Sequence, residues 1–150
     1  MTLHISSPAF EDGGPIPREY GYTEANVNPA LSIEGVPADA ACLAIVMDDP
    51  DAVEPAGKVW DHWVVWNVDA DIGHIPEDWD AAGALVGRND YGENGYGGPN
   101  PPDREHTYRF VCYALAERVG LKPGATKAEL EEVINGQILD EALLEGTYAP

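Results

Sequence analysis

Glycine and proline interrupt this chain so often that long helices are excluded from most of its length. The 150 residues include 16 Gly and 13 Pro, and both residue types are unfavourable inside helices. Between the interruptions lie short apolar runs rich in β-branched and aromatic residues, a pattern typical of β-strands. The length suits one domain, so we expect residues 1–150 to form a single, mainly β domain.

The apolar runs predict strands of unequal character. The run over 41–47 is continuously apolar, so we expect a central strand that is covered on both faces. Residues 11–28 and 89–104 contain too much glycine and proline for regular structure. The predicted strands are Leu3–Phe10, Ala30–Glu34, Ala41–Met47, Val59–Val68, Thr107–Ala116 and a shorter one over Ala84–Arg88.

The C-terminal part of the chain has a different periodicity. Thr126 and Glu129 form a capping-box pattern before apolar residues at helical spacing, which predicts a helix over 126–134. The spacing over 138–144 predicts a second short helix, and residues 147–148 are expected to return as an edge strand. Because strands precede helices, the sequence predicts an antiparallel two-sheet β-sandwich with short C-terminal helices.

The net charge is unusually negative. Eight basic residues oppose 27 acidic ones, giving a net charge of −19, whereas small soluble domains carry a magnitude of about 2–8. The acids are spread along the chain, and their repulsion is screened at molar salt, where the Debye length is about 3 Å. We interpret this composition as that of a halophile's protein. It excludes nucleic acid as a partner, because a phosphate backbone needs clustered Lys and Arg.

Compartment signals favour the cytoplasm. No apolar run approaches the ~18 residues of a membrane span, and the first ten residues lack the pattern of a signal peptide. Cys42 and Cys112 each lie inside an apolar run, which predicts buried free thiols, and no zinc-like cysteine spacing occurs. We therefore expect a cytoplasmic protein without a cofactor.

Two polar segments adjoin predicted strands. Asp49 follows an apolar strand and precedes Pro50, which restricts Asp49 to an extended conformation and holds its carboxylate in a rigid corner. His62 lies among tryptophans, and strict alternation would place Trp60, His62 and Trp66 on one face. Taken alone, the acids are also compatible with a solvated turn, and His62 with a hydrogen-bonded histidine of the core.

A third segment combines a rigid loop with two polar rings. Gly98, Asn100 and Pro101 belong to a Gly/Pro-rich loop that can shape a rim and offer the backbone N–H groups of its non-proline residues. His106 and Tyr108 follow it and share one face of the last predicted strand. Alone, the loop is also compatible with an ordinary surface connection.

Together the three segments predict one small concave site. Two imidazoles and a phenol would donate hydrogen bonds, Asp49 would orient an imidazole, and the ligand would be a small oxyanion, above all phosphate. We expect a non-enzymatic binding protein. The alternative is a metal-dependent or acid–base hydrolase using Asp49, His62 and His106, against which stand the absence of short ligand spacings and of a clear nucleophile. A third reading, inhibition of a kinase or protease, has no partner motif behind it.

The chain resembles the phosphatidylethanolamine-binding protein family, which includes the Raf kinase inhibitor proteins, and is most similar to its short bacterial and archaeal branch. The stretches that carry this resemblance are Asp48–Ala52, Trp60–Asn67, Gly87–Leu115 and Gly136–Tyr148. The resemblance implies a two-sheet β fold with an anion pocket at one end, a homodimer, and a kinase or protease as partner. The pocket residues it implies are Asp49, Trp60, His62, Gly98, Asn100, Pro101, His106 and Tyr108.

The chain departs from this pattern at several positions, among them Val53, which stands where relatives often have a proline. Asn100 stands where relatives of the branch often have Cys, and Asp61 where a His or an aromatic residue is common. These departures weaken the expectation of a kinase partner more than that of the pocket.

Overall fold

The continuously apolar run forms the central strand of the larger of two sheets. The computed structural model describes residues 2–150. In it, β3 (Cys42–Asp49) pairs antiparallel with β4 (Trp60–Val68) on one side and β7 (His106–Leu115) on the other. All of β3 is buried, as expected for a strand covered on both faces. The strand order is β6-β4-β3-β7-β8, with β6 at Leu85–Val86 and β8 at Ile138–Tyr148.

A smaller sheet covers one face of the larger one. It has the order β1-β2-β5, with β1 at His4–Ser6, β2 at Leu31–Glu34 and β5 at His74–Ile75. β1 is shorter than the predicted strand because the Ser7 hydroxyl donates to Ala30 O and accepts from Ala9 N, which turns the chain before Phe10. The sequence did not predict β5.

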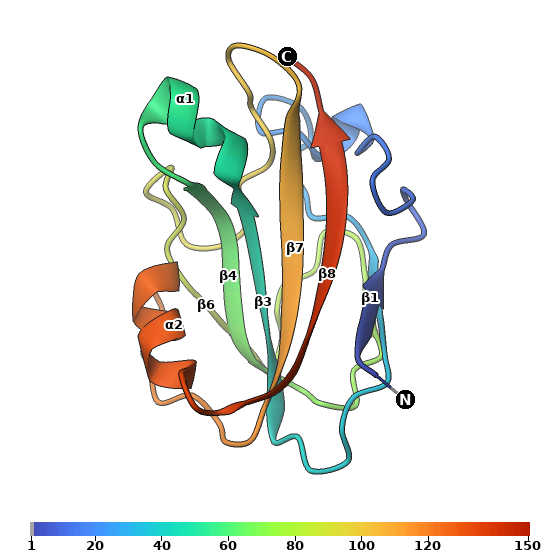
Figure 1. Cartoon of the computed structure of the whole chain (residues 1–150), viewed down its shortest axis with the longest axis vertical. Helices are drawn as coiled ribbons and strands as arrows, with labels where there is room; N and C mark the ends of the chain where they lie inside the picture. Colours follow the sequence, from blue (N-terminus) through green and yellow to red (C-terminus); the bar gives the residue numbers. More distant parts are fainter. Residues whose placement is uncertain (1) are drawn as a thin grey trace.

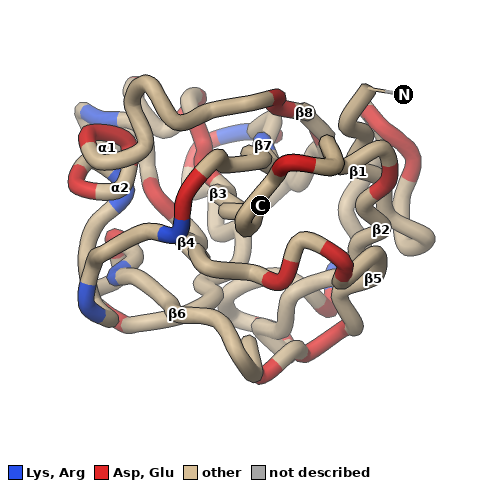
Figure 2. The backbone as a smooth tube through the Cα atoms, turned by 90° about the horizontal axis from the view of Figure 1, so that it is seen from below, with Lys and Arg blue, Asp and Glu red and all other residues tan. Residues whose placement is uncertain are grey.

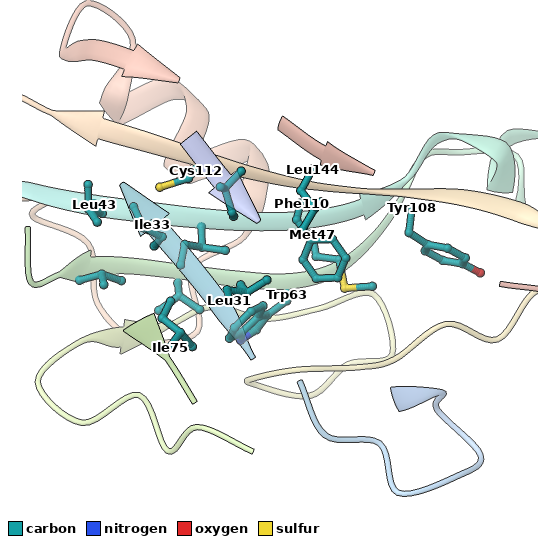
Figure 3. Close-up of a cluster of buried hydrophobic side chains, with 14 of the residues drawn as sticks. Leu31, Ile33, Leu43, Met47, Trp63, Ile75, Tyr108, Phe110, Cys112 and Leu144 are labelled. Atoms are coloured by element: carbon teal, nitrogen blue, oxygen red, sulfur yellow. The ribbon is translucent and has the colours of Figure 1, made fainter. Parts of the chain in front are cut away.

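The main core lies between the two sheets (Figure 3), and Tyr108 lies at one end of it. The free cysteines Cys42 and Cys112 are both buried, as predicted. Core residues of both sheets include Ile5, Leu31, Ile33, Leu43, Met47, Trp63, Ile75, Phe110, Cys112 and Leu144.

Part of the opposite face of the larger sheet is covered by α2 (Lys127–Ile134), which lies on the side of β4 and β6 in Figure 1. Leu130 and Ile134 pack there in a second apolar cluster. The helix begins at the predicted capping box, in which the Thr126 hydroxyl accepts from Glu129 N and the Glu129 carboxylate accepts from Thr126 N at 3.0 Å.

The predicted second C-terminal helix is wrong: residues 138–144 begin the long strand β8. This strand pairs antiparallel with β7 from Tyr148 back to Ile138. Its side chains alternate, so that Leu144 is buried in the core whereas Leu143 is 49% exposed. The apolar spacing also fits a helix, and the pairing with a strand some 30 residues earlier is invisible to local periodicity. The fold class is confirmed as mainly β with two antiparallel sheets and few short helices.

Several loops gather at one end of the larger sheet, where β3 ends and β4 and β7 begin (Figure 1). A 3-10 turn over Pro50–Ala52 and the short helix α1 (Val53–Ala56) connect β3 to β4 there. The Gly/Pro-rich loop before β7 reaches the same end. The three segments singled out in the sequence therefore meet at one place.

The acidic residues are distributed over the backbone of both sheets and their loops (Figure 2). No helix within residues 2–150 has the length and apolar character that crossing a bilayer requires.

Candidate functional site

A β-bulge in β4 aims His62 at the end of the sheet. Met47 pairs with Trp63, but the next pair is Asp48 with Asp61, so β4 has one residue more than β3 at this point. His62 is that extra residue. A bulge changes the direction of side chains along a strand, and it separates the part of β4 before His62 from the part after it.

The bulge corrects the predicted single face of β4. Trp60 and His62 line a cavity at the end of the sheet. Val64 and Trp66 lie instead in the second apolar cluster, against α2. Trp60 therefore shares the cavity with His62, whereas Trp66 does not.

The cavity has a volume of about 210 Å³, which is below the ~300–1,000 Å³ of pockets for drug-sized ligands and suits a small group. Of the eight predicted site residues, seven line it and Gly98 does not. The full lining is Asp49, Ala52, Pro55, Ala56, Trp60, His62, Tyr91, Asn100, Pro101, Pro102, His106 and Tyr108.

Two carboxylates clamp the His106 ring. Its Nδ1 lies 2.6 Å from Asp49 Oδ2, and its Nε2 lies 2.7 Å from Asp103 Oδ1. Burial opposes the charged ring, but the hydrogen bonds and charges of Asp49 and Asp103 outweigh burial and raise the pKa of His106. Both ring nitrogens donate when the ring is protonated, so this arrangement favours an imidazolium.

Asp49 is rigid, as its sequence context predicted. Its backbone is extended (φ −128°, ψ 97°), and its Oδ1 accepts from Asp51 N at 2.9 Å. Because Oδ2 accepts from His106, both oxygens are occupied. The predicted orientation of an imidazole by Asp49 is thus found at His106.

His62 is held as a neutral ring. Its Nδ1 donates to Gly97 O at 2.7 Å. Burial lowers the pKa of His62, and the Gly97 carbonyl offsets this only in part. In the neutral ring the other nitrogen, Nε2, carries a lone pair. The expectation of two hydrogen-bond-donating imidazoles is therefore corrected: the N–H of His62 is already used by the loop.

Tyr108 supplies a buried phenol beside both imidazoles. Its ring meets that of His62 edge to face, with centroids 5.2 Å apart, and lies 6.3 Å from that of His106. Burial and the nearby Asp49 carboxylate raise the pKa of Tyr108, whereas the Asn100 backbone N–H lowers it. The phenol stays protonated, and it can donate to a ligand.

Gly98 acts behind the cavity wall. Its N–H donates to Asn26 Oδ1 at 2.7 Å, and its carbonyl accepts from the Tyr91 hydroxyl at 2.8 Å. A Cβ at this position would lie 2.1 Å from Tyr20 O. Gly98 therefore allows the loop to approach the chain around Tyr20, and its N–H is unavailable to a ligand.

Sequence reasoning missed Tyr91, which stacks on Tyr22 with ring centroids 3.8 Å apart and lines the cavity. A local sequence signal could have indicated Tyr91. Asn89 Oδ1 accepts a hydrogen bond from Tyr91 N at 2.9 Å, which forms an Asx turn, and an Asn two residues before an aromatic residue is compatible with such a turn. Asp103 was also missed, because an exposed loop carboxylate carries no sequence signal of its partner.

Two comparisons with known proteins cover nearly the whole chain. Residues 6–149 match the phosphatidylethanolamine-binding protein family. A UPF0098 protein of Methanothermobacter thermautotrophicus is 42% identical over 97% of this chain and 98% of its own length.

The chain belongs to the phosphatidylethanolamine-binding protein family. The crystal structure of a homologue from Chlamydia trachomatis superimposes with a TM-score of 0.91 at 37% identity, covering 98% of this chain and 97% of the other. E. coli YbcL, a member of the same family, gives a TM-score of 0.90 at 28% identity, with 99% and 98% coverage. Members of the family are generally non-catalytic binding proteins.

Metal ligation was part of the alternative prediction. Within residues 2–150, no group of three or more His, Cys, Asp or Glu side chains is arranged to hold a metal ion. In particular, both nitrogens of His106 already face carboxylates.

Proposed function

We propose that this family member is a non-enzymatic binding protein whose end cavity takes a small oxyanion, either free phosphate or the phosphoryl group of a headgroup. The observation that carries the proposal is the buried His106 ring, held towards its charged form at the wall of a cavity of about 210 Å³. A fixed imidazolium in a partly apolar cavity is a strong donor for an anionic oxygen.

In this proposal, six of the cavity residues have stated roles. His106 Nε2–H and the Tyr108 hydroxyl donate to the anion, and Asn100 at the rim adds amide donors. Asp49 fixes the ring that donates. Trp60 and Tyr91 form an apolar wall, and the low local dielectric beside such a wall strengthens hydrogen bonds.

The strongly negative surface is compatible with this proposal. Charges beyond about one Debye length are screened, and at molar salt that length is about 3 Å. Binding is therefore decided by the groups in contact with the anion. The affinity we expect is about millimolar, equivalent to roughly 4 kcal/mol.

The four histidines provide an internal control for the test. His62 and His106 line the cavity, whereas His4 and His74 are exposed on the smaller sheet. Inorganic phosphate is titrated into the protein in molar KCl at constant pH while the imidazole NMR resonances are followed. We expect saturable shifts of His62 and His106 without matching shifts of the two exposed histidines. No cavity-specific change up to tens of millimolar phosphate would refute the proposal.

The hydrolase alternative predicts turnover. Among residues 2–150, no Ser, Thr or Cys lines the cavity, so a covalent mechanism lacks its usual nucleophiles. A soluble alkyl phosphomonoester titrated in the same way separates the two: we expect it to bind unchanged, whereas release of inorganic phosphate in the phosphorus NMR spectrum would favour the hydrolase. Regulation of a kinase or protease, a homodimer and a cytoplasmic location stay predictions.

A further inference from the structure

The Nε2 atom of His106 already has a carboxylate beside it. Asp103 Oδ1 lies 2.7 Å from Nε2, a distance typical of a charge-assisted hydrogen bond. This nitrogen is the one that would donate to a ligand, because Nδ1 is committed to Asp49. A ligand oxygen can therefore accept from Nε2–H only after the Asp103 carboxylate has left it.

The two carboxylates on His106 differ in how firmly they are held. The Asp49 side chain is 4% exposed, and its second oxygen is fixed by Asp51 N. The Asp103 side chain is 36% exposed and sits on the loop before β7. Its other contact is local, with the neighbouring Arg104 N at 3.0 Å. The half-exposed Asp103 side chain can therefore rotate into water, whereas both oxygens of the buried Asp49 carboxylate are engaged.

We propose that Asp103 is an internal competing anion that sets the affinity and the charge preference of the cavity. This inference rests on the proposed function. With Asp103 in place, one imidazolium faces two carboxylates, so the cluster carries a net charge of about −1 and repels a second anion. Phosphate binds by displacing the Asp103 carboxylate from His106. The displaced carboxylate stays near the cavity, and its negative charge weakens the binding of multiply charged anions most.

Asp103 thereby acts as a specificity-determining residue. A neutral side chain at this position leaves His106 paired with Asp49 alone, a neutral pair whose Nε2–H is open to the ligand. The gain comes from removing a competitor and a like charge rather than from a new contact. Because the substitution removes both a competing ion pair and a like charge, we expect a gain of about threefold to tenfold in phosphate affinity.

The test compares phosphate titrations of the full chain at fixed KCl and pH. Asp103→Asn keeps the side-chain shape, and Asp103→Ala also removes the oxygen that can accept from Nε2–H. Asp80→Asn is the matched control, because Asp80 is an exposed loop carboxylate outside the cavity lining whose Oδ1 also accepts from a nearby backbone N–H. Circular dichroism and thermal unfolding check that each variant keeps its fold.

The expected result is tighter phosphate binding by both Asp103 variants, with Asp103→Ala at least equal to Asp103→Asn, and an unchanged Asp80→Asn. Sulfate, a dianion, should gain at least as much as phosphate. Equal affinity of the wild type and the Asp103 variants overturns the inference and leaves the proposed function standing. Absence of binding in every protein overturns both.

Discussion

Replacing Asp49 by Asn tests the clamp on His106 most directly, because Asp49 receives two donors at once. Its Oδ1 accepts from Asp51 N and its Oδ2 from His106 Nδ1. An asparagine has one side-chain oxygen, so its amide nitrogen must face one of these N–H groups. The variant therefore loses a hydrogen bond to a charged group and leaves a buried donor unsatisfied.

The expected cost follows from these two losses. A hydrogen bond to a charged group contributes about 1.5–3 kcal/mol, and an unsatisfied buried donor costs about 1–3 kcal/mol. The free energy of unfolding should fall by about 3–5 kcal/mol, in line with the cost of breaking a buried ion pair. In a chain of this size, such a loss lowers Tm by roughly 10 °C.

Urea unfolding in molar KCl measures this loss, and Asp69→Asn is the matched control. Asp69 Oδ1 accepts from Asp71 N at 2.9 Å, which is the same turn as at Asp49 but exposed and without a histidine. The pKa of His106, followed by NMR, should fall in Asp49→Asn and stay unchanged in the control. A loss below about 1 kcal/mol with an unchanged pKa of His106 would refute the clamp.

The pH dependence of this difference has a defined sign. The pKa of His106 is raised in the folded state, so the stability it contributes is fully present below its unfolded value of about 6.5 and is lost as pH rises through the folded pKa. The difference between the wild type and Asp49→Asn should therefore be larger at pH 6 than above the folded pKa of His106.

Three further predictions concern the fold and the surface. Gly98→Ala should lower the free energy of unfolding by about 1–3 kcal/mol, because its Cβ would meet Tyr20 O, whereas Gly120→Ala, with nothing within 4 Å, should stay within about 0.5 kcal/mol in the same urea assay. Thr126→Ala should cost about 1 kcal/mol through the lost cap with Glu129, and a wild-type value would contradict the capping role. Stability should rise as KCl is raised from about 0.1 M to molar concentration, where the Debye length falls from about 10 to 3 Å; a salt-independent free energy would refute the interpretation of the net charge of −19.

The parts of the fold that sequence patterns predicted are those with strong local signals. The central strand β3 is continuously apolar over residues 42–47, and α2 has both a capping box and helical periodicity. The start of β8 was misassigned because Ile138 and Leu139 are apolar but 41% and 38% exposed. Their spacing along the sequence therefore does not indicate which face of the segment is buried. Its pairing with β7 is a long-range contact that no window of sequence contains.

The candidate site was predictable in its members but less so in their roles. Strict alternation placed His106 and Tyr108 together, because β7 continues without a bulge through these positions. For β4 the same rule failed, since the extra residue at His62 depends on the register with β3. The contact of Asp103 with His106 depends on a loop conformation, and the sequence gives no means of choosing one.

The bulge at His62 divides β4 into two regions with separate duties. Trp60 and His62 line the ligand cavity, whereas Val64 and Trp66 pack beneath α2. Selection on what the protein binds and selection on how stable it is therefore act on different stretches of one strand. Deletion of a single residue at this point would turn the side chains before the bulge to the other face of the sheet. A one-residue deletion should therefore weaken ligand binding more than a single substitution in β4.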